Sequence, residues 1–231
     1  MTLDSSRVPA RRRFQSEQLS ERVARIIREA IMVGEFRAPE HLRTEKLAAD
    51  FGVSPTPVRE ALMILQAEGA VQWEPRKGYR VSPLTLEDIR DMFLVQAFIA
   101  GELAARAAGS VTDEALAEME QLQAQLEAAA KAGDHMLVDE LNFIIHRSIN
   151  TASGSRRLAA TLRQSVQYVP LGFWERIDGW NQASAHQHRP IFDALRAKDP
   201  EQARAAMAAH VKDIGDLLLS YLSRQNADGA R

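Results

Sequence analysis

Apolar residues in the first third of the chain recur at three- and four-residue steps, the spacing of one face of an α-helix. The first such stretch covers residues 16–34. A second, residues 45–51, follows Thr44, and a third, residues 55–69, follows Ser54. Threonine and serine both favour the position that caps a helix N-terminus. This part of the chain is therefore predicted to hold three helices.

Two short strands are predicted directly after these helices. Residues 70–74 (AVQWE) and 78–82 (GYRVS) are rich in strand-forming types and are separated by the turn-forming residues 75–77. Gly78 supplies a permissive backbone at the start of the second strand. Three helices followed by a hairpin are typical of a winged helix-turn-helix.

The rest of the chain consists of Ala- and Leu-rich helical stretches with no competing strand pattern. Their short connections imply antiparallel neighbours in a bundle, and residues 168–180 form one irregular stretch. The predicted fold is mainly α: an N-terminal winged helix-turn-helix (three helices plus a β-hairpin) joined to an all-α antiparallel helical bundle. The helices predicted in the bundle are residues 85–109, 112–132, 134–152, 155–168, 183–198 and 200–224.

Charge is distributed unevenly along the chain. Residues 1–82 contain 14 Lys and Arg against 11 Asp and Glu, a net charge of +3, whereas the remainder carries −5. A basic N-terminal part and an acidic C-terminal part indicate a small polyanion-binding module attached to a larger unit. Residues 1–15 have four arginines and few apolar groups, so we expect a flexible basic arm. The predicted division is this arm, a DNA-binding domain at 16–82 and a helical domain at 83–231.

Composition excludes several classes of protein. The 231-residue chain has no cysteine, which excludes disulfides, thiolate metal ligands and a cysteine nucleophile. We expect no membrane span, because no apolar run approaches about 18 residues. The basic N-terminus lacks an apolar segment, so we expect no secretory signal. The expectation is a cytoplasmic protein without a membrane partner.

A helix-turn-helix places the N-terminus of its second helix in the DNA major groove. Ser54 and Thr56 are short hydroxyl donors suited to phosphate, and Arg59 can bind guanine in a bidentate manner. A capped surface helix with solvated charges has the same pattern, so the pattern alone leaves both interpretations open. Further candidates for phosphate contacts, in the preceding turn and the wing, are Arg43, Arg76 and Lys77.

The string LRTEKLAADFGVSPTPVREALMILQAEGAV, followed by RKGYRV, resembles the winged-helix domain of GntR-family transcriptional regulators. The helical remainder is similar to the FCD ligand domain of that family's FadR subfamily. In such regulators a basic side chain of the recognition helix and a wing glycine approach DNA, which implies these roles for Arg59 and Gly78. Family members commonly have Arg where this chain has Pro55, so one contact is expected to be absent and the operator to differ.

Four residues of the helical domain form a candidate metal site. Asn142 and His146 share one helix face, and His188 and His210 lie on two later helices. Three imidazoles and one oxygen donor suit zinc or nickel, although histidines on helices are more often structural. The resemblance favours the metal, because many FCD domains have Asp-x-x-x-His and two later histidines, matched here by NFIIH, QHRPIFDAL and MAAHV. Asn142 replaces the commoner Asp, which predicts weaker divalent-cation binding.

The metal site predicts the chemistry of an effector. A metal with an open position would bind the carboxylate of a small organic acid and bias the spacing of the two DNA-binding heads in a homodimer. FCD domains often carry Arg and Glu on their first helix, where this chain has Ala97 and Gly101, so an anion-binding arginine is expected to be absent. Aromatic residues that line an apolar pocket, or serve only packing, are Phe173, Trp174 and Trp180.

The sequence therefore predicts a ligand-responsive bacterial transcription factor and not an enzyme. We expect a repressor that binds a palindromic operator in double-stranded DNA as a homodimer. The alternative is a metal-dependent hydrolase that uses His146, His188 and His210, but the chain has no HExxH, GxSxG or Gly-rich phosphate-loop motif. A helical interaction adaptor would leave the basic arm and the hairpin unexplained.

Overall fold

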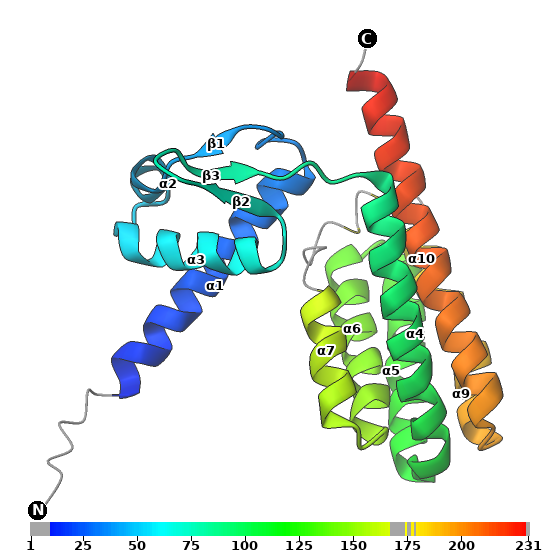
Figure 1. The fold of residues 1–231 in the computed structure, drawn as a ribbon. Helices are drawn as coiled ribbons and strands as arrows, with labels where there is room; N and C mark the ends of the chain where they lie inside the picture. Colours follow the sequence, from blue (N-terminus) through cyan, green and yellow to red (C-terminus); the bar gives the residue numbers. More distant parts are fainter. Residues whose placement is uncertain (1–9, 167–173, 175–176, 178, 230–231) are drawn as a thin grey trace, which may run out of the picture. The chain divides into compact units, whose positions relative to one another are not determined.

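The chain divides into two compact units, residues 1–84 and 85–231, and each is described by itself (Figure 1). The boundary lies two residues beyond the one that the sequence suggested. The computed structural model describes the backbone of residues 10–166, 174, 177 and 179–229.

The first helix is longer than predicted. Helix α1 spans Ala10–Met32, so it begins six residues before the expected start at Ser16. Residues 10–15 were predicted to belong to a flexible arm and are helical instead, while residues 1–9 lie outside the described part of the chain. The reason is that residues 10–32 contain neither Gly nor Pro and are rich in helix-forming Arg, Ala, Glu and Gln.

Helices α2 (Thr44–Phe51) and α3 (Pro55–Ala67) form the predicted helix-turn-helix. Gly52 ends α2 with a φ of +65°, a backbone conformation that glycine adopts without strain. The expected cap at Thr44 is wrong, because Arg43 holds the N-cap position and makes no side-chain cap bond. Ser54 holds the N-cap position of α3, also without such a bond.

A three-stranded antiparallel sheet completes this unit, with strand order β1-β3-β2. Strands β2 (Val71–Glu74) and β3 (Gly78–Val81) form the predicted hairpin, in which Trp73 pairs with Tyr79. Strand β1 (His41–Leu42) was not predicted, because two residues are too short to show alternation. It pairs with β3, which thereby becomes the central strand.

The second unit is a bundle of helices, as predicted, in which α4 and α10 lie side by side (Figure 1). The predicted helix at 183–198 is wrong in one respect, because it is two helices separated at Gln187 and His188. The helices of this unit are α4 (Leu86–Ser110), α5 (Asp113–Ala132), α6 (His135–Ala152), α7 (Arg156–Val166), α8 (Trp180–His186), α9 (Arg189–Arg196) and α10 (Pro200–Gly229).

Two glycines allow α4 and α10 to approach closely. A Cβ atom at Gly101 would lie 2.9 Å from the carbonyl oxygen of Arg204, and one at Gly215 would lie 2.7 Å from Cγ of Phe93.

Helix α4 has the length and mean hydropathy (1.2) of a membrane-spanning helix, but 61% of its apolar window is buried inside the unit. Its composition is therefore that of a core helix.

Candidate nucleic-acid interface and candidate metal centre

The N-terminus of α3 presents polar side chains that are free to bind a ligand. Ser54, Thr56 and Arg59 are exposed, whereas Val58 and Leu62 on the opposite face are fully buried. Thr56 and Arg59 are three residues apart and so share one face of the helix. The Ser54 hydroxyl makes no cap bond, and Arg59 forms no ion pair with any described residue. These side chains keep their donors available.

The β2–β3 turn forms a basic tip. The amide of Lys77 donates to the carbonyl of Glu74 (3.1 Å) and closes the turn. Arg76 and Gly78 have φ values of +65° and +88°, which makes the turn tight. The side chains of Arg76 and Lys77 are exposed.

At the base of the same hairpin, Glu74 forms ion pairs with neighbouring basic side chains. The Glu74 carboxylate lies 3.2 Å from Nε2 of His41 and 2.8 Å from Nε of Arg80. The hydrogen bond from His41 is the main cause that lowers the pKa of Glu74, and the charge of Arg80 adds to it. Nζ of Lys77 also lies 3.8 Å from this carboxylate, so Arg76 is the tip residue without an ion pair among the described residues. Exposed Arg43 adds another cation at the start of α2.

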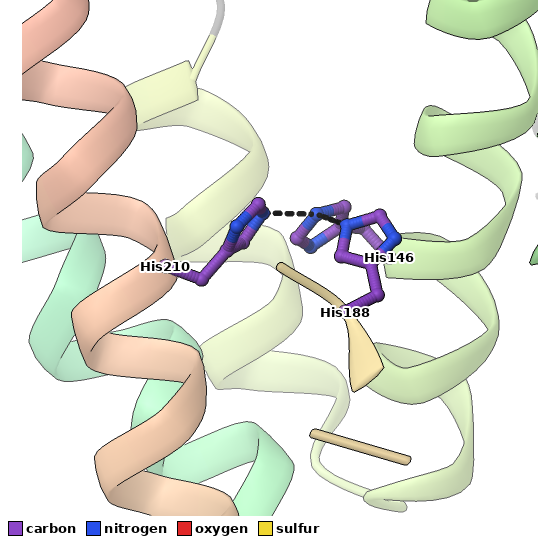
Figure 2. A group of neighbouring side chains, drawn as sticks. All are labelled: His146, His188 and His210. Atoms are coloured by element: carbon purple, nitrogen blue, oxygen red, sulfur yellow. Dashed lines mark hydrogen bonds between the residues drawn. The ribbon is translucent and has the colours of Figure 1, made fainter. Parts of the chain in front are cut away.

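Three histidines from distant parts of the chain meet inside the helical unit (Figure 2). His146 comes from the middle of α6, His188 from the α8–α9 junction and His210 from α10. Nε2 of His146 lies 3.2 Å from Nε2 of His210 and 3.3 Å from Nε2 of His188. All three potential ligand atoms lie within 4.8 Å of one another, a spacing that could hold a metal ion.

Two glutamines, which the sequence analysis missed, orient two of these imidazoles. Oε1 of Gln123 lies 2.8 Å from Nδ1 of His188, and Oε1 of Gln187 lies 3.1 Å from Nδ1 of His210. Each amide nitrogen has its own acceptor: the carbonyl of Ala185 at 2.8 Å for Gln123 and a carboxylate oxygen of Asp213 at 3.3 Å for Gln187. The amide oxygens must therefore face the rings.

This arrangement assigns the protons on the rings. An amide oxygen only accepts, so Nδ1 must carry the proton in both His188 and His210, which leaves their Nε2 lone pairs directed at His146. A neutral His146 has at most one proton to share between these two acceptors. A cation at the centre would satisfy all three nitrogens, so the donor set fits a metal ion.

Burial keeps the imidazoles neutral. It lowers the pKa of His146 to about 4 and that of His210 to about 3. The pKa of His188 is lowered well below its ordinary value, first by burial and then by the neighbouring His146 and His210. Neutral imidazole is the form that binds metals.

The fourth predicted ligand lies one turn before His146 on α6. Oδ1 of Asn142 is buried and has no hydrogen-bond partner among the described residues. Because buried polar atoms are nearly always hydrogen-bonded, an unpartnered oxygen on the same helix face as His146 is a candidate metal ligand. His135 and His186 are exposed, and no cluster of metal-ligating side chains among the described residues includes them.

Of the three aromatic residues predicted to line a pocket or to serve packing, Trp174 and Trp180 lie in the described part of the chain. Trp174 and Trp180 stack with ring centroids 4.4 Å apart, and Nε1 of Trp180 donates to buried Asp139 at 2.7 Å. Phe173 lies outside the described residues. Ala97 and Gly101, which stand where FCD domains often carry Arg and Glu, are both buried, and Gly101 packs so closely on the α10 backbone that no larger side chain fits there without movement.

Both units match known domain families. Residues 19–81 match the bacterial regulatory proteins of the gntR family, and residues 91–213 match the FCD domain. The chain belongs to the GntR family of transcriptional regulators that carry an FCD domain. It is therefore a transcription factor and not an enzyme.

Named relatives agree with this assignment. The chain is 30% identical over 174 residues to a probable D-xylose utilization operon transcriptional repressor of Paenarthrobacter nicotinovorans, covering 74% of this chain and 75% of that protein. It is 23% identical over 216 residues to the Escherichia coli HTH-type transcriptional repressor RspR, covering 92% and 94%. The solved structure of E. coli McbR/YncC has a similar fold, with a TM-score of 0.66 at 23% identity, covering 87% of this chain and 96% of that one.

Proposed function

We propose that this GntR-family regulator, of the FadR subfamily, is a metal-containing repressor whose affinity for DNA responds to a small organic acid. It binds a palindromic operator as a homodimer in the cytoplasm. The observation that carries the proposal is the convergence of three neutral imidazoles, two of which have their Nδ1 atoms held by Gln123 and Gln187. Such outer hydrogen bonds are the usual support of metal-binding histidines.

The proposed metal ligands are Asn142, His146, His188 and His210. Nitrogen-rich donor sets suit zinc or nickel, and the neutral Asn142 lowers the affinity relative to a carboxylate. A divalent cation bound there would supply an open position for the carboxylate of an organic acid. The protein's part is to hold three rings in place inside the unit and to exclude water, since His188 and His210 are 0% and 4% exposed.

The proposed DNA contacts come from α3, the α2 N-terminus and the wing. Arg59 would bind guanine in the major groove, and the hydroxyls of Ser54 and Thr56 would bind phosphate. The exposed positions of all three side chains support these roles. The remaining proposed contacts to the DNA backbone are Arg43, Arg76, Lys77 and the Gly78 main chain.

The proposed homodimer has a candidate surface on α4. Leu94, Val95 and Phe98 are 57%, 51% and 69% exposed, and their spacing places them on one side of the helix. Exposed apolar patches commonly mark interaction sites. In a dimer, two DNA-binding domains contact two half-sites at once and reach an affinity that a single small domain lacks. Repression is inferred from the relatives that are named repressors.

The proposal is tested by operator binding with and without metal. Fluorescence anisotropy would measure binding of the full chain to labelled DNA from upstream of its own gene, at fixed salt. We expect organic acids to change the Kd of the metal-loaded parent protein and to have no effect on a His188→Ala variant. An equal response in both proteins would contradict the proposed effector mechanism.

A further inference from the structure

A second polar site lies where α6 turns into α7. The turn consists of Ser153, Gly154 and Ser155, and α4 contributes Arg106 from its last two turns. Together with the first turn of α7, these residues line a cavity of about 710 Å³. This volume is in the range of small-molecule sites. None of the lining residues belongs to the metal centre or to the DNA-binding unit.

The cavity gathers positive charge from three exposed arginines. Three of its lining residues are Arg106, Arg156 and Arg157, and no acidic residue lines it. Arg156 and Arg157 form no ion pair with any described residue, and Arg106 donates to the hydroxyl of Ser155 (3.1 Å). Glu102, the acidic neighbour of Arg106, accepts from Arg204 of α10 at 2.6 Å, and this bond lowers the pKa of Glu102 more than the charge of Arg106 does.

This cluster is not part of a generally basic surface. Residues 83–231 carry a net charge of −5, so the cluster is a local concentration of positive charge in an acidic unit. Like charges in one cavity repel each other, and an anion bound between them would remove that repulsion. The simplest physical complement of the cluster is therefore a negatively charged ligand.

The backbone adds donors to the same cavity. Ala159 is the first α7 residue whose amide bonds a preceding carbonyl, that of Ser155 at 3.1 Å. The amides of Arg156 and Arg157 precede it, where a helix has no internal acceptors. The positive end of the helix dipole thus faces the cavity that the guanidinium groups surround.

We infer that this cavity is a second ligand site of the regulator and binds the phosphate group of a small molecule. Guanidinium groups match phosphate oxygens in pairs, and three of them suit a dianion better than a single carboxylate. No aromatic or large apolar residue lines the cavity, so the anionic group is the part of the ligand that is recognised.

The test is calorimetric titration of the full-length protein in a chloride buffer free of phosphate and sulfate. The probes are inorganic phosphate and glycerol 3-phosphate, which separate free phosphate from a phosphate ester as the preferred ligand. We expect Arg157→Gln and Arg106→Gln to raise the Kd about tenfold or more, the usual effect of losing a charged hydrogen bond. Arg163→Gln is the matched control, because Arg163 is exposed on α7 but does not line the cavity.

Several results would overturn the inference. The parent protein would overturn it by binding neither inorganic phosphate nor glycerol 3-phosphate. The Arg163→Gln control would overturn it by raising the Kd as much as Arg157→Gln and Arg106→Gln do. A His146→Ala variant should retain phosphate binding, and its loss there would assign the phosphate to the metal centre instead. If the parent binds neither probe but Arg157→Gln weakens operator binding, the arginines contact the DNA backbone and the inference is wrong.

Discussion

Replacing Gln123 with leucine should weaken metal binding without removing a ligand. Gln123 is 5% exposed, accepts from Nδ1 of His188 at 2.8 Å and donates to the Ala185 carbonyl at 2.8 Å. Leucine has a similar size but cannot accept the ring proton, so the His188 ring loses its fixed orientation. Loss of such an outer partner costs about 10- to 100-fold in metal affinity, which is ~1.4–2.8 kcal/mol.

The assay is competition for zinc against a chromophoric chelator. Gln125→Leu is the matched control, because Gln125 is exposed on the same helix. A Gln123→Glu variant separates orientation from general stability, because its carboxylate still accepts from His188 but cannot donate to Ala185. We expect Gln123→Glu to retain zinc affinity and Gln123→Leu to lose it. Equal affinities of the Gln123→Leu and Gln125→Leu variants would refute the reasoning.

Three further predictions concern DNA binding, packing and pH. Arg59→Ala should abolish specific operator binding while the thermal unfolding midpoint stays unchanged; operator binding as tight as that of the parent at the same salt would contradict the assigned role. Gly215→Ala should destabilise the fold by about 1–3 kcal/mol in urea unfolding, because its Cβ would lie 2.7 Å from Phe93, whereas Gly109→Ala, which meets nothing within 4 Å, should not destabilise it. Metal-free protein should lose unfolding free energy as the pH falls from about 7 to about 5. In the unfolded chain both histidines have a pKa of about 6.5 and take up protons over this range. In the folded protein half-buried His146 and buried His210, with pKa values of about 4 and about 3, do not. A flat stability profile over that range would count against neutral, buried imidazoles.

The sequence predicted the helices well because each has a local signature, whereas His188 and His210 were grouped with His146 mainly through the family resemblance. Three-residue and four-residue apolar spacing marked the helices, and the spacing of Asn142 and His146 placed both on one face of α6. The break at Gln187 and His188 was missed although Pro190 follows it in the first turn of α9, a position that is typical of a helix start. Helical residues 10–15 were missed because arginine-rich composition was interpreted as disorder, although arginine favours helices.

The outer partners of the metal centre could not be predicted from the sequence. Gln123 lies 65 positions before His188, and their contact arises only when α5 packs against α9. One signal was present, because a glutamine occupies a buried position between Met119 and Leu126 on an otherwise apolar face. The arginine cavity is similar, since Arg106 and Arg157 come together only through the fold.

The central claim is that the three converged histidines hold a metal ion. The direct measurement is the elemental metal content of protein purified without chelator or affinity metal, beside a His146→Ala variant and an exposed-site His186→Ala control. The account predicts close to one zinc or nickel per chain in the parent and the control, and none in His146→Ala. Parent protein that stays empty after incubation with zinc, nickel and manganese would contradict it.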